Sequence, residues 1–502
     1  MRTILSRNSK MSSNNYATDI MKKSILLCIL IIICITSRAA ATDNDLGNIS
    51  RKWLGKLEIP NGPKLTVTIE LFKKADGTFG AVMGSPDQGR MGIPVDKFDL
   101  SDNKIRFDIN ALGGVIEGIL SEDKSSIDAE LSQRGAKIPL RLNSVKELPS
   151  LSSRRQLPTK PYPYIEEEVV FENKTDGVKL SGTLTRPTNG GPFPGVLLIA
   201  GSGRNDRNGT GMGHFHLLAD YLTRHGIATL RYDKRGVMRS AGDFTTATLE
   251  DFIQDAAAGL SYLRNRKDIA GDKVGLIGHS EGGVVAPMVA AKSSDAAFVV
   301  SLGGTGINGF DLMVLQDCSE ARAGGASEQD IAIIRKWVKR FYAVVRDEKN
   351  IENAKDKLNE MYAEMTPTEK KAFKAEKGFP TPGTTLHIDV ALTPWFREFV
   401  QLNPQEAYKK IKCPVLVVIG SKDTQVPPKD NLNGIEDALK AGRHSKYTLL
   451  EMPDLNHLFQ TANTGSTSEY DELEEIIAPS ALITVTNWIM VQTELLPDHI
   501  SM

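Results

Sequence analysis

The stretch GLIGHSEGG, Gly275–Gly283, surrounds one serine, Ser280, with small residues. An apolar run precedes this serine, and a helical pattern, GGVVAPMVAAK, follows it. A G-x-S-x-G sequence between a strand and a helix favours a sharp turn that lifts the hydroxyl above the sheet edge. The free N–H groups of the helix then face whatever binds there. Ser280 is therefore either an exposed nucleophile or a plain turn residue, and the rest of the chain must decide between them.

Apolar strands alternate with helical patterns on both sides of this motif. Strands this apolar are buried on both faces, and with crossover helices between them they predict a parallel sheet of the α/β class. An antiparallel hairpin is expected ahead of them, from about residue 165 to Pro187. The predicted strands are GVLLIA (Gly195–Ala200), IATLRYD (Ile227–Asp233), VGLIGH (Val274–His279), AFVVSLGG (Ala297–Gly304), PVLVVIG (Pro414–Gly420) and KYTLLEM (Lys446–Met452).

The alternation breaks for roughly 110 residues, where a charged and helical pattern indicates an insertion over the sheet. We expect this helical cap at about 305–410, within an α/β domain that spans 165–495. A small all-β domain is predicted at 45–148, because short alternating runs there are separated by turn residues. Its runs fit a barrel or a sandwich equally well. A segment rich in Pro, Ser and Arg at 149–164 is the predicted linker.

The N-terminal 41 residues are typical of a leader. Met21-Lys22-Lys23 precedes a short apolar run, and a sequence ending in small residues follows at 38–42. These features favour a signal peptide cleaved near Ala41, with Met21 as a possible true start. An uncleaved anchor is the alternative, although the apolar run is short for a membrane span. We expect a secreted or periplasmic protein with no stable membrane insertion after cleavage.

Composition excludes several classes of function. The chain has 502 residues, a net charge of −1 and a pI near 6.7, so no global field favours nucleic acid. Cys318 and Cys413 would remain after cleavage, which is no disulfide framework, and free thiols are favoured over one bridge. No Cys/His spacing resembles a metal site, and His214 and His216 are interpreted as structural. We expect neither a metal nor a cofactor.

A serine nucleophile needs a base, and the base needs an orienting acid. Asp423 follows the predicted strand Pro414–Gly420, and His457 follows the predicted strand Lys446–Met452. The chain order of serine, acid and histidine is the one expected when a serine turn of this kind lies on a parallel sheet. The pattern predicts a triad of Ser280, Asp423 and His457. Asp454 is the rival acid, but its closeness to His457 in sequence favours a turn role.

Acyl transfer also needs donors for an oxyanion. One predicted donor is the backbone N–H of Glu281, directly after the serine. The other is expected in the loop GSGRNDR, where glycines allow close approach of the backbone, with Ser202 favoured over Gly203. A phosphate-binding loop is the competing interpretation, but the Gly-Lys-Ser/Thr ending is missing.

The chain resembles the α/β-hydrolase superfamily, and it is most similar to secreted or periplasmic serine esterases with an N-terminal β domain. The matching stretches are LLIAGSGRNDRNG, LRYDKRGVMRS, GLIGHSEGG, PVLVVIGSKDTQVP and DLNHLF. The resemblance implies hydrolysis of a small-molecule carboxylic ester without a cofactor, through the three residues above. One departure is Arg204, where relatives often have proline.

Four further residues were considered as substrate contacts. Arg204 and Trp395 are candidate pocket residues, with packing between cap and core the equal alternative for Trp395. Asp233 and Arg235 follow a strand end, and we expect them to tie loops together.

Several functions remain open. Short-chain acyl esters are the first expectation, and a serine peptidase acting on amino-acyl or peptide bonds is the main alternative. A thioesterase is less favoured because secretion separates the enzyme from most acyl-CoA. A binding protein with a retired hydrolase domain is the alternative of another class.

Overall fold

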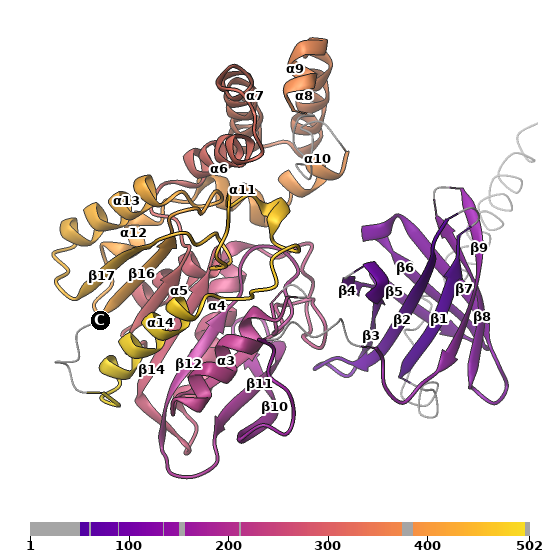
Figure 1. Cartoon of the computed structure of the whole chain (residues 1–502), viewed down its shortest axis with the longest axis horizontal. Helices are drawn as coiled ribbons and strands as arrows, with labels where there is room; N and C mark the ends of the chain where they lie inside the picture. Colours follow the sequence, from indigo (N-terminus) through magenta and orange to yellow (C-terminus); the bar gives the residue numbers. More distant parts are fainter. Residues whose placement is uncertain are drawn as a thin grey trace, which may run out of the picture.

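The computed structural model describes residues 51–59, 62–88, 90–133, 135–149, 156–209, 212–373 and 385–496. The predicted signal peptide lies outside them. The described residues form two separate sheets, one N-terminal and one that carries the serine motif (Figure 1).

The N-terminal sheet is antiparallel and has nine described strands in the order β4-β3-β2-β1-β9-β8-β7-β6-β5. Its two edge strands are consecutive in the chain, and β3 contacts β5, so the sheet curls into an incompletely closed barrel rather than a sandwich (Figure 1). The strands are β1 (Lys52–Glu58), β2 (Lys64–Lys73), β3 (Phe79–Ser85), β4 (Arg90–Pro94), β5 (Lys97–Ser101), β6 (Lys104–Ile109), β7 (Gly114–Leu120), β8 (Ser126–Gln133) and β9 (Ala136–Ser144), with 3-10 turns at Pro86–Gln88 and Asn110–Leu112.

The second sheet has eight described strands in the order β10-β11-β13-β12-β14-β15-β16-β17. The first pairings are antiparallel, and the strands from β13 to β17 run parallel. The α/β-hydrolase architecture expected from the sequence is thus confirmed. The strands are β10 (Tyr164–Asn173), β11 (Val178–Pro187), β12 (Phe193–Ile199), β13 (Ala228–Tyr232), β14 (Ile269–His279), β15 (Val299–Leu302), β16 (Val415–Gly420) and β17 (Tyr447–Met452).

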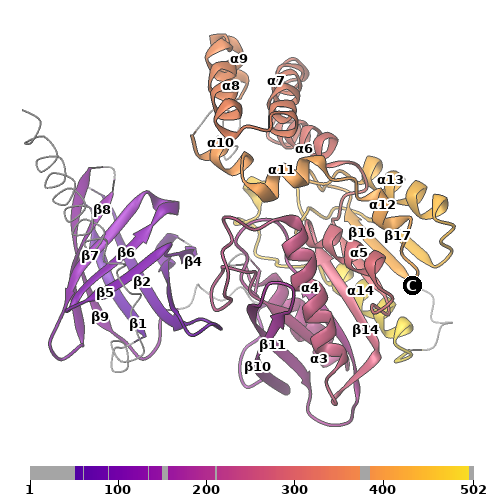
Figure 2. The same ribbon diagram turned by 180° about the vertical axis from the view of Figure 1, so that it is seen from behind.

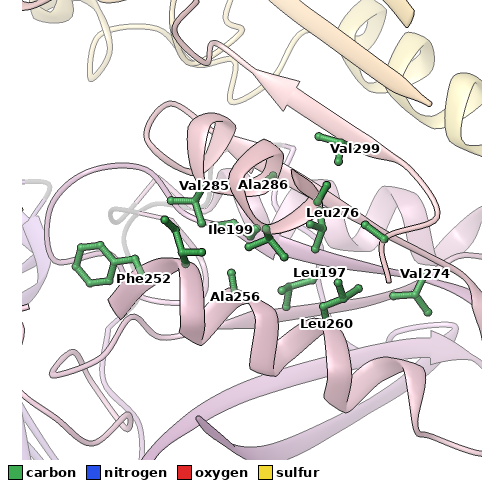
Figure 3. Close-up of a cluster of buried hydrophobic side chains, with 14 of the residues drawn as sticks. Leu197, Ile199, Phe252, Ala256, Leu260, Val274, Leu276, Val285, Ala286 and Val299 are labelled. Carbon is green, nitrogen blue, oxygen red and sulfur yellow. The ribbon is translucent and has the colours of Figure 1, made fainter. Parts of the chain in front are cut away.

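Helices cover both faces of this sheet (Figure 2). Along β12, Leu197 and Ile199 point to the core shared with α4 (Leu249–Arg264) and α5 (Gly282–Lys292), as Figure 3 shows. The alternate residues of the same strand, including Val196, belong to the core under α3 (His214–Arg224) and α14 (Pro479–Gln492). The period of two therefore explains why the strand is buried throughout. The remaining helices of the sheet layer are α12 (Gln405–Tyr408) and α13 (Pro428–Ala441).

The cap is helical, as the sequence predicts, and it rises beyond the C-terminal ends of the parallel strands (Figures 1 and 2). It has its own core, in which Trp337, Phe341 and Tyr342 are fully buried. Its described helices are α6 (Gly309–Ala323), α7 (Glu328–Asp347), α8 (Ile351–Glu364), α9 (Pro367–Ala372), α10 (Thr385–Ala391) and α11 (Pro394–Gln401).

The barrel touches the α/β region at the loop that follows β13. The N–H of Ala75 donates to the carbonyl of Arg239 at 2.7 Å, and the Arg239 guanidinium lies 5.5 Å from the ring centre of Phe72. Cys318 and Cys413 are free thiols, as favoured from the sequence. Within the part of the chain that the structure describes, no helix has the length and apolar character needed to cross a membrane.

Candidate active site

Ser280 lies in the sharp turn between β14 and α5. Its φ of 56° is in the left-handed region, a strained conformation for a residue with a side chain. Small neighbours are required, because a Cβ on Gly278 would overlap the carbonyl of Gly282 and a Cβ on Gly282 would overlap the carbonyl of Ile199. The structure therefore gives the turn that the motif predicts.

Asp423 and His457 meet at the carboxyl ends of β16 and β17. His457 Nδ1 and Asp423 Oδ2 are 2.8 Å apart, and both side chains are buried. The other carboxylate oxygen of Asp423 accepts from the N–H groups of Gln425 and Val426, which fixes its orientation. Asp454 instead pairs with Lys422 at the surface. The acid that orients His457 is thus Asp423 and not its rival.

Contacts of Ser280 and of the residues beside it place the serine turn at the same sheet edge as His457. The N–H of Ser280 donates to the carbonyl of Leu302 at 2.8 Å, while a Cβ on the next residue, Gly303, would lie 3.2 Å from the His457 ring. His279 Nε2 lies 2.8 Å from the carbonyl oxygen of His457. The described contacts include no hydrogen bond from the Ser280 hydroxyl to His457. The fold therefore gathers the three predicted residues at one sheet edge.

A row of buried histidines supports His457. Burial, followed by the nearby His457 and His214, holds the pKa of His279 well below its ordinary value. A neutral His279 can still donate its Nε2 proton to the His457 carbonyl. Burial first and His457 second lower the pKa of His214 to about 4. The His214 ring packs against Phe215, with ring centres 4.6 Å apart, and against His279, with ring centres 5.5 Å apart. Among the described residues no group of three or more potential metal ligands is found.

The loop after β12 turns its carbonyl groups toward Asn205. The Asn205 amide donates to the carbonyls of Gly201 at 2.9 Å and Ser202 at 2.7 Å. In a trans peptide the C=O and the following N–H point in opposite directions, so the N–H groups of Ser202 and Gly203 face away from Asn205. Among the described hydrogen bonds, none uses the N–H of Ser202, Gly203 or Glu281 as a donor. Within the described part of the chain these N–H groups therefore have no hydrogen-bond acceptor, a condition for an oxyanion donor. The sequence pattern did not single out Asn205, although an amide side chain shortly after Gly-Ser-Gly is the signal that could have indicated it.

A pocket of about 180 Å³ opens beside Ser280 under the cap. Trp395 lines it and also packs against the cores of both the sheet and the cap, so the two alternatives given for this residue both hold. Its indole nitrogen is buried without a hydrogen-bond partner among the described residues. Aromatic and aliphatic side chains make up most of the lining. The lining residues are Ser202, Ser280, Glu281, Val284, Thr305, Leu312, Met313, Gln316, Trp395, Phe396, Phe399, Gln425 and Val426.

Arg204 is not part of this pocket, which corrects the expectation. Its guanidinium lies 5.5 Å from the ring centre of Phe244, and it donates to the carbonyl of Gly236 at 3.3 Å. The φ of 89° at Gly203 turns the chain just before this residue. Arg204 therefore packs on the loop after β13.

Two buried ion pairs tie the surrounding loops, as expected for Asp233 and Arg235. Asp233 binds Arg207 at 2.7 Å. Burial by itself would lower the pKa of Arg207, but the Asp233 carboxylate outweighs it, so this pKa is raised. Arg235 binds Asp255 of α4 at 2.6 Å. Both pairs hold loops and neither lines the pocket.

Two curated relatives each match part of the chain. Esterase EstD of Thermotoga maritima is 27% identical over 310 residues, which are 61% of this chain and 64% of that protein. An uncharacterised 31.7 kDa protein from the traX-finO region of Escherichia coli is 24% identical over 233 residues, 46% of this chain and 73% of its own length. The chain thus spans less than two thirds of the length of the first of these relatives.

Solved structures that resemble the chain include the Pyrococcus furiosus esterase Pf2001, at 16% identity and a TM-score of 0.40, covering 66% of this chain and 95% of that one. Est1E of Butyrivibrio proteoclasticus, solved with ferulic acid, has 17% identity and a TM-score of 0.36, covering 65% and 97%.

A family profile matches residues 176–444, more than half of the chain. The matched segment carries the serine turn, the loop after β12 and Asp423, and it ends before His457. The profile is that of the S15 family, the X-Pro dipeptidyl-peptidases. With the sheet order, the serine turn and this match together, the chain belongs to the X-Pro dipeptidyl-peptidase (S15) family of α/β-hydrolase fold.

Proposed function

We propose that this protein is a serine hydrolase that cleaves carboxylic esters with a small uncharged acyl group. The observation that carries the proposal is the pocket beside Ser280, which is small and mostly apolar. Among the described residues that line it, the only ionisable side chain is Glu281, and that carboxylate is bound to the buried Lys234 at 2.8 Å. Such a pocket favours a neutral acyl group over a charged one.

The first half of the reaction forms an acyl-enzyme. His457 accepts the proton of the Ser280 hydroxyl as the oxygen attacks the ester carbonyl carbon, and Asp423 stabilises the resulting imidazolium through the 2.8 Å contact. The carbonyl oxygen becomes an oxyanion, which the N–H groups of Glu281 and Ser202 stabilise. The intermediate then collapses, the bond to the alcohol oxygen breaks, and His457 returns its proton to the leaving alcohol.

The second half releases the acid. Water gives a proton to His457 and attacks the acyl carbon, the same N–H groups hold the new oxyanion, and Ser280 leaves with the proton from His457. The free carboxylic acid departs and the serine is restored. The cap over the pocket limits the entry of water and the size of the acyl group.

Peptide hydrolysis is the second candidate function, and the family match favours it. A peptidase that binds a free amino terminus needs an available carboxylate in its pocket. Glu281 is already paired with Lys234, and the buried Glu320 of α6 accepts from Thr424 and from the N–H of Thr467 at 3.2 Å. The Glu281 charge is balanced by Lys234, and both oxygens of Glu320 accept hydrogen bonds, which supports the ester over the amino-acyl substrate.

The test is hydrolysis of p-nitrophenyl esters of increasing acyl length beside X-Pro anilides. We expect turnover of the short esters, and a loss on the order of 10⁶-fold in kcat for Ser280→Ala, because the nucleophile is removed. Ser293→Ala, at the other end of α5, is the matched control and should retain full activity. Turnover of the anilides alone would replace the ester proposal with the peptidase.

A further inference from the structure

Lys234 differs from the two charged residues beside it. Asp233 and Arg235 hold loops away from the pocket, whereas the side chain of Lys234 runs toward the serine turn. Lys234 is 4% exposed, although a lysine is rarely buried without a specific partner. The aliphatic and charged parts lie against aromatic rings, with Nζ 3.9 Å from the ring centre of Phe252.

The Lys234 ammonium joins the two segments that carry the free N–H groups. It donates to Glu281 Oε1 at 2.8 Å and to the carbonyl of Gly201 at 3.1 Å. Glu281 supplies one proposed oxyanion donor through its own N–H. The Gly201 carbonyl belongs to the same peptide group as the N–H of Ser202, the second proposed donor. One buried cation thus links the peptide group that carries the Ser202 N–H to the side chain of Glu281, the residue that carries the other N–H.

The contact between Lys234 and Glu281 also balances the negative charge of the Glu281 carboxylate. Glu281 is buried, and its Oε2 has no hydrogen-bond partner among the described residues. An unpaired carboxylate one residue from the nucleophile would oppose the oxyanion that forms nearby, because like charges repel strongly where water is excluded. Lys234 neutralises this carboxylate without occupying the pocket.

We infer that Lys234 is a positioning residue of the oxyanion hole, which sets the spacing of the Ser202 and Glu281 N–H groups and neutralises the Glu281 side chain. The inference rests on the proposed roles of Ser280 and these N–H groups, but not on the identity of the acyl substrate. Because the oxyanion forms only in the transition state, loss of the Lys234 ammonium should lower kcat and leave KM nearly unaltered.

The test uses Lys234→Met in the full chain, since methionine keeps the packing on Phe252 and removes the ammonium. Two rates are measured: kcat for a p-nitrophenyl ester, and the rate constant for labelling of Ser280 by a fluorophosphonate. We expect both to fall about 100-fold, the range seen when one oxyanion donor is lost, with KM within about twofold. Lys292→Met removes an exposed ion pair on α5 and should change neither rate. The fraction of sites finally labelled reports folded protein, so misfolding would lower that fraction and not the rate constant.

A double variant separates the two parts of the role and also guards against an unstable single variant. Lys234→Met with Glu281→Gln removes both charges, a replacement that buried ion pairs often tolerate. We expect it to label about tenfold faster than the single variant and about tenfold slower than the unchanged protein, because the Gly201 tether is still missing. Labelling of both variants within threefold of the unchanged protein would overturn the inference. If the unchanged protein is labelled at Ser280 but hydrolyses no ester, the ester proposal fails and the labelling rates still test Lys234.

Discussion

The N-terminal barrel and the α/β region place their charged residues differently. The barrel strands alternate between a buried and an exposed side, and a typical ion pair, Arg141 with Asp128, lies at the surface. In the α/β region the central strands are buried on both faces, and Arg235 with Asp255 is almost fully buried.

The difference follows from how each sheet is covered. Helices cover both faces of the α/β sheet, so polar groups gather at the ends of its strands. Charged side chains in the loops there are paired with one another. The barrel instead keeps its outer side in water. Buried ion pairs such as Arg207 with Asp233 and Lys234 with Glu281 therefore lie in the loops around the edge where the chemistry is proposed.

Among the charged residues of the two regions, the largest effect should come from changing the buried acid at that edge. Asp423→Asn is expected to lower kcat about 10⁴-fold, because an amide does not hold the required His457 tautomer. Steady-state ester kinetics would measure the loss. Asp128→Asn on the barrel surface is the control and should leave kcat unchanged. A comparable loss of kcat in this variant would show that the effect of Asp423→Asn is not specific to the proposed site.

A smaller effect is expected from breaking a buried ion pair. Arg235→Met should lower the free energy of unfolding by about 3–5 kcal/mol, because it leaves the Asp255 carboxylate buried and unpaired. Arg141→Met removes the exposed barrel pair and should cost less than about 1 kcal/mol. Urea unfolding followed by circular dichroism gives both values. Equal costs would show that burial does not control the contribution of these pairs.

Acid should weaken the α/β region before the barrel. Burial, and after it the nearby His457, lowers the pKa of His214 to about 4 in the folded protein, whereas in the unfolded chain this histidine gains a proton near its ordinary pKa of 6.5. The unfolded state is therefore favoured as pH falls from 6.5 to 4, at a cost of about 3 kcal/mol. His214→Gln should remove this part of the pH dependence.

Hydrogen exchange of β12 at pH 4.5 and pH 7 measures that effect directly. The barrel strands are the internal control, because the sequence has no histidine between residues 51 and 148. Faster exchange in β7 than in β12 at pH 4.5 would contradict the expectation.

Sequence reasoning located the chemistry better than it located the barrel. The serine turn, Asp423 and His457 were placed correctly at strand ends, because their apolar strands are long and bounded by clear loops. In the barrel, alternating runs at 66–71, 75–82, 104–109, 114–120 and 126–131 predict β2, β3, β6, β7 and β8, but the sequence pattern did not reveal β1, β4, β5 and β9. In β9 the pattern contains Pro139, which argues against a central strand; yet the β1 pairing ends at Leu140, so no bond to β1 is required there.

The pocket and its supports were less accessible to sequence reasoning. Arg204 was expected near substrate and instead packs on Phe244, since its direction depends on the turn at Gly203. Lys234 was passed over between Asp233 and Arg235, because three adjacent charges look alike in a sequence.

The sequence by itself determined the fold class, the strained turn at Ser280 and the order of nucleophile, acid and histidine, since local periodicity and small residues express them directly. Only the tertiary structure decided which side chains meet across the loops: Asn205 with the carbonyls before it, Lys234 with Glu281, and Trp395 with the pocket. These contacts join residues from different strands and the cap. Their partners are chosen by packing and by the need to satisfy buried charge, which no single stretch of sequence encodes.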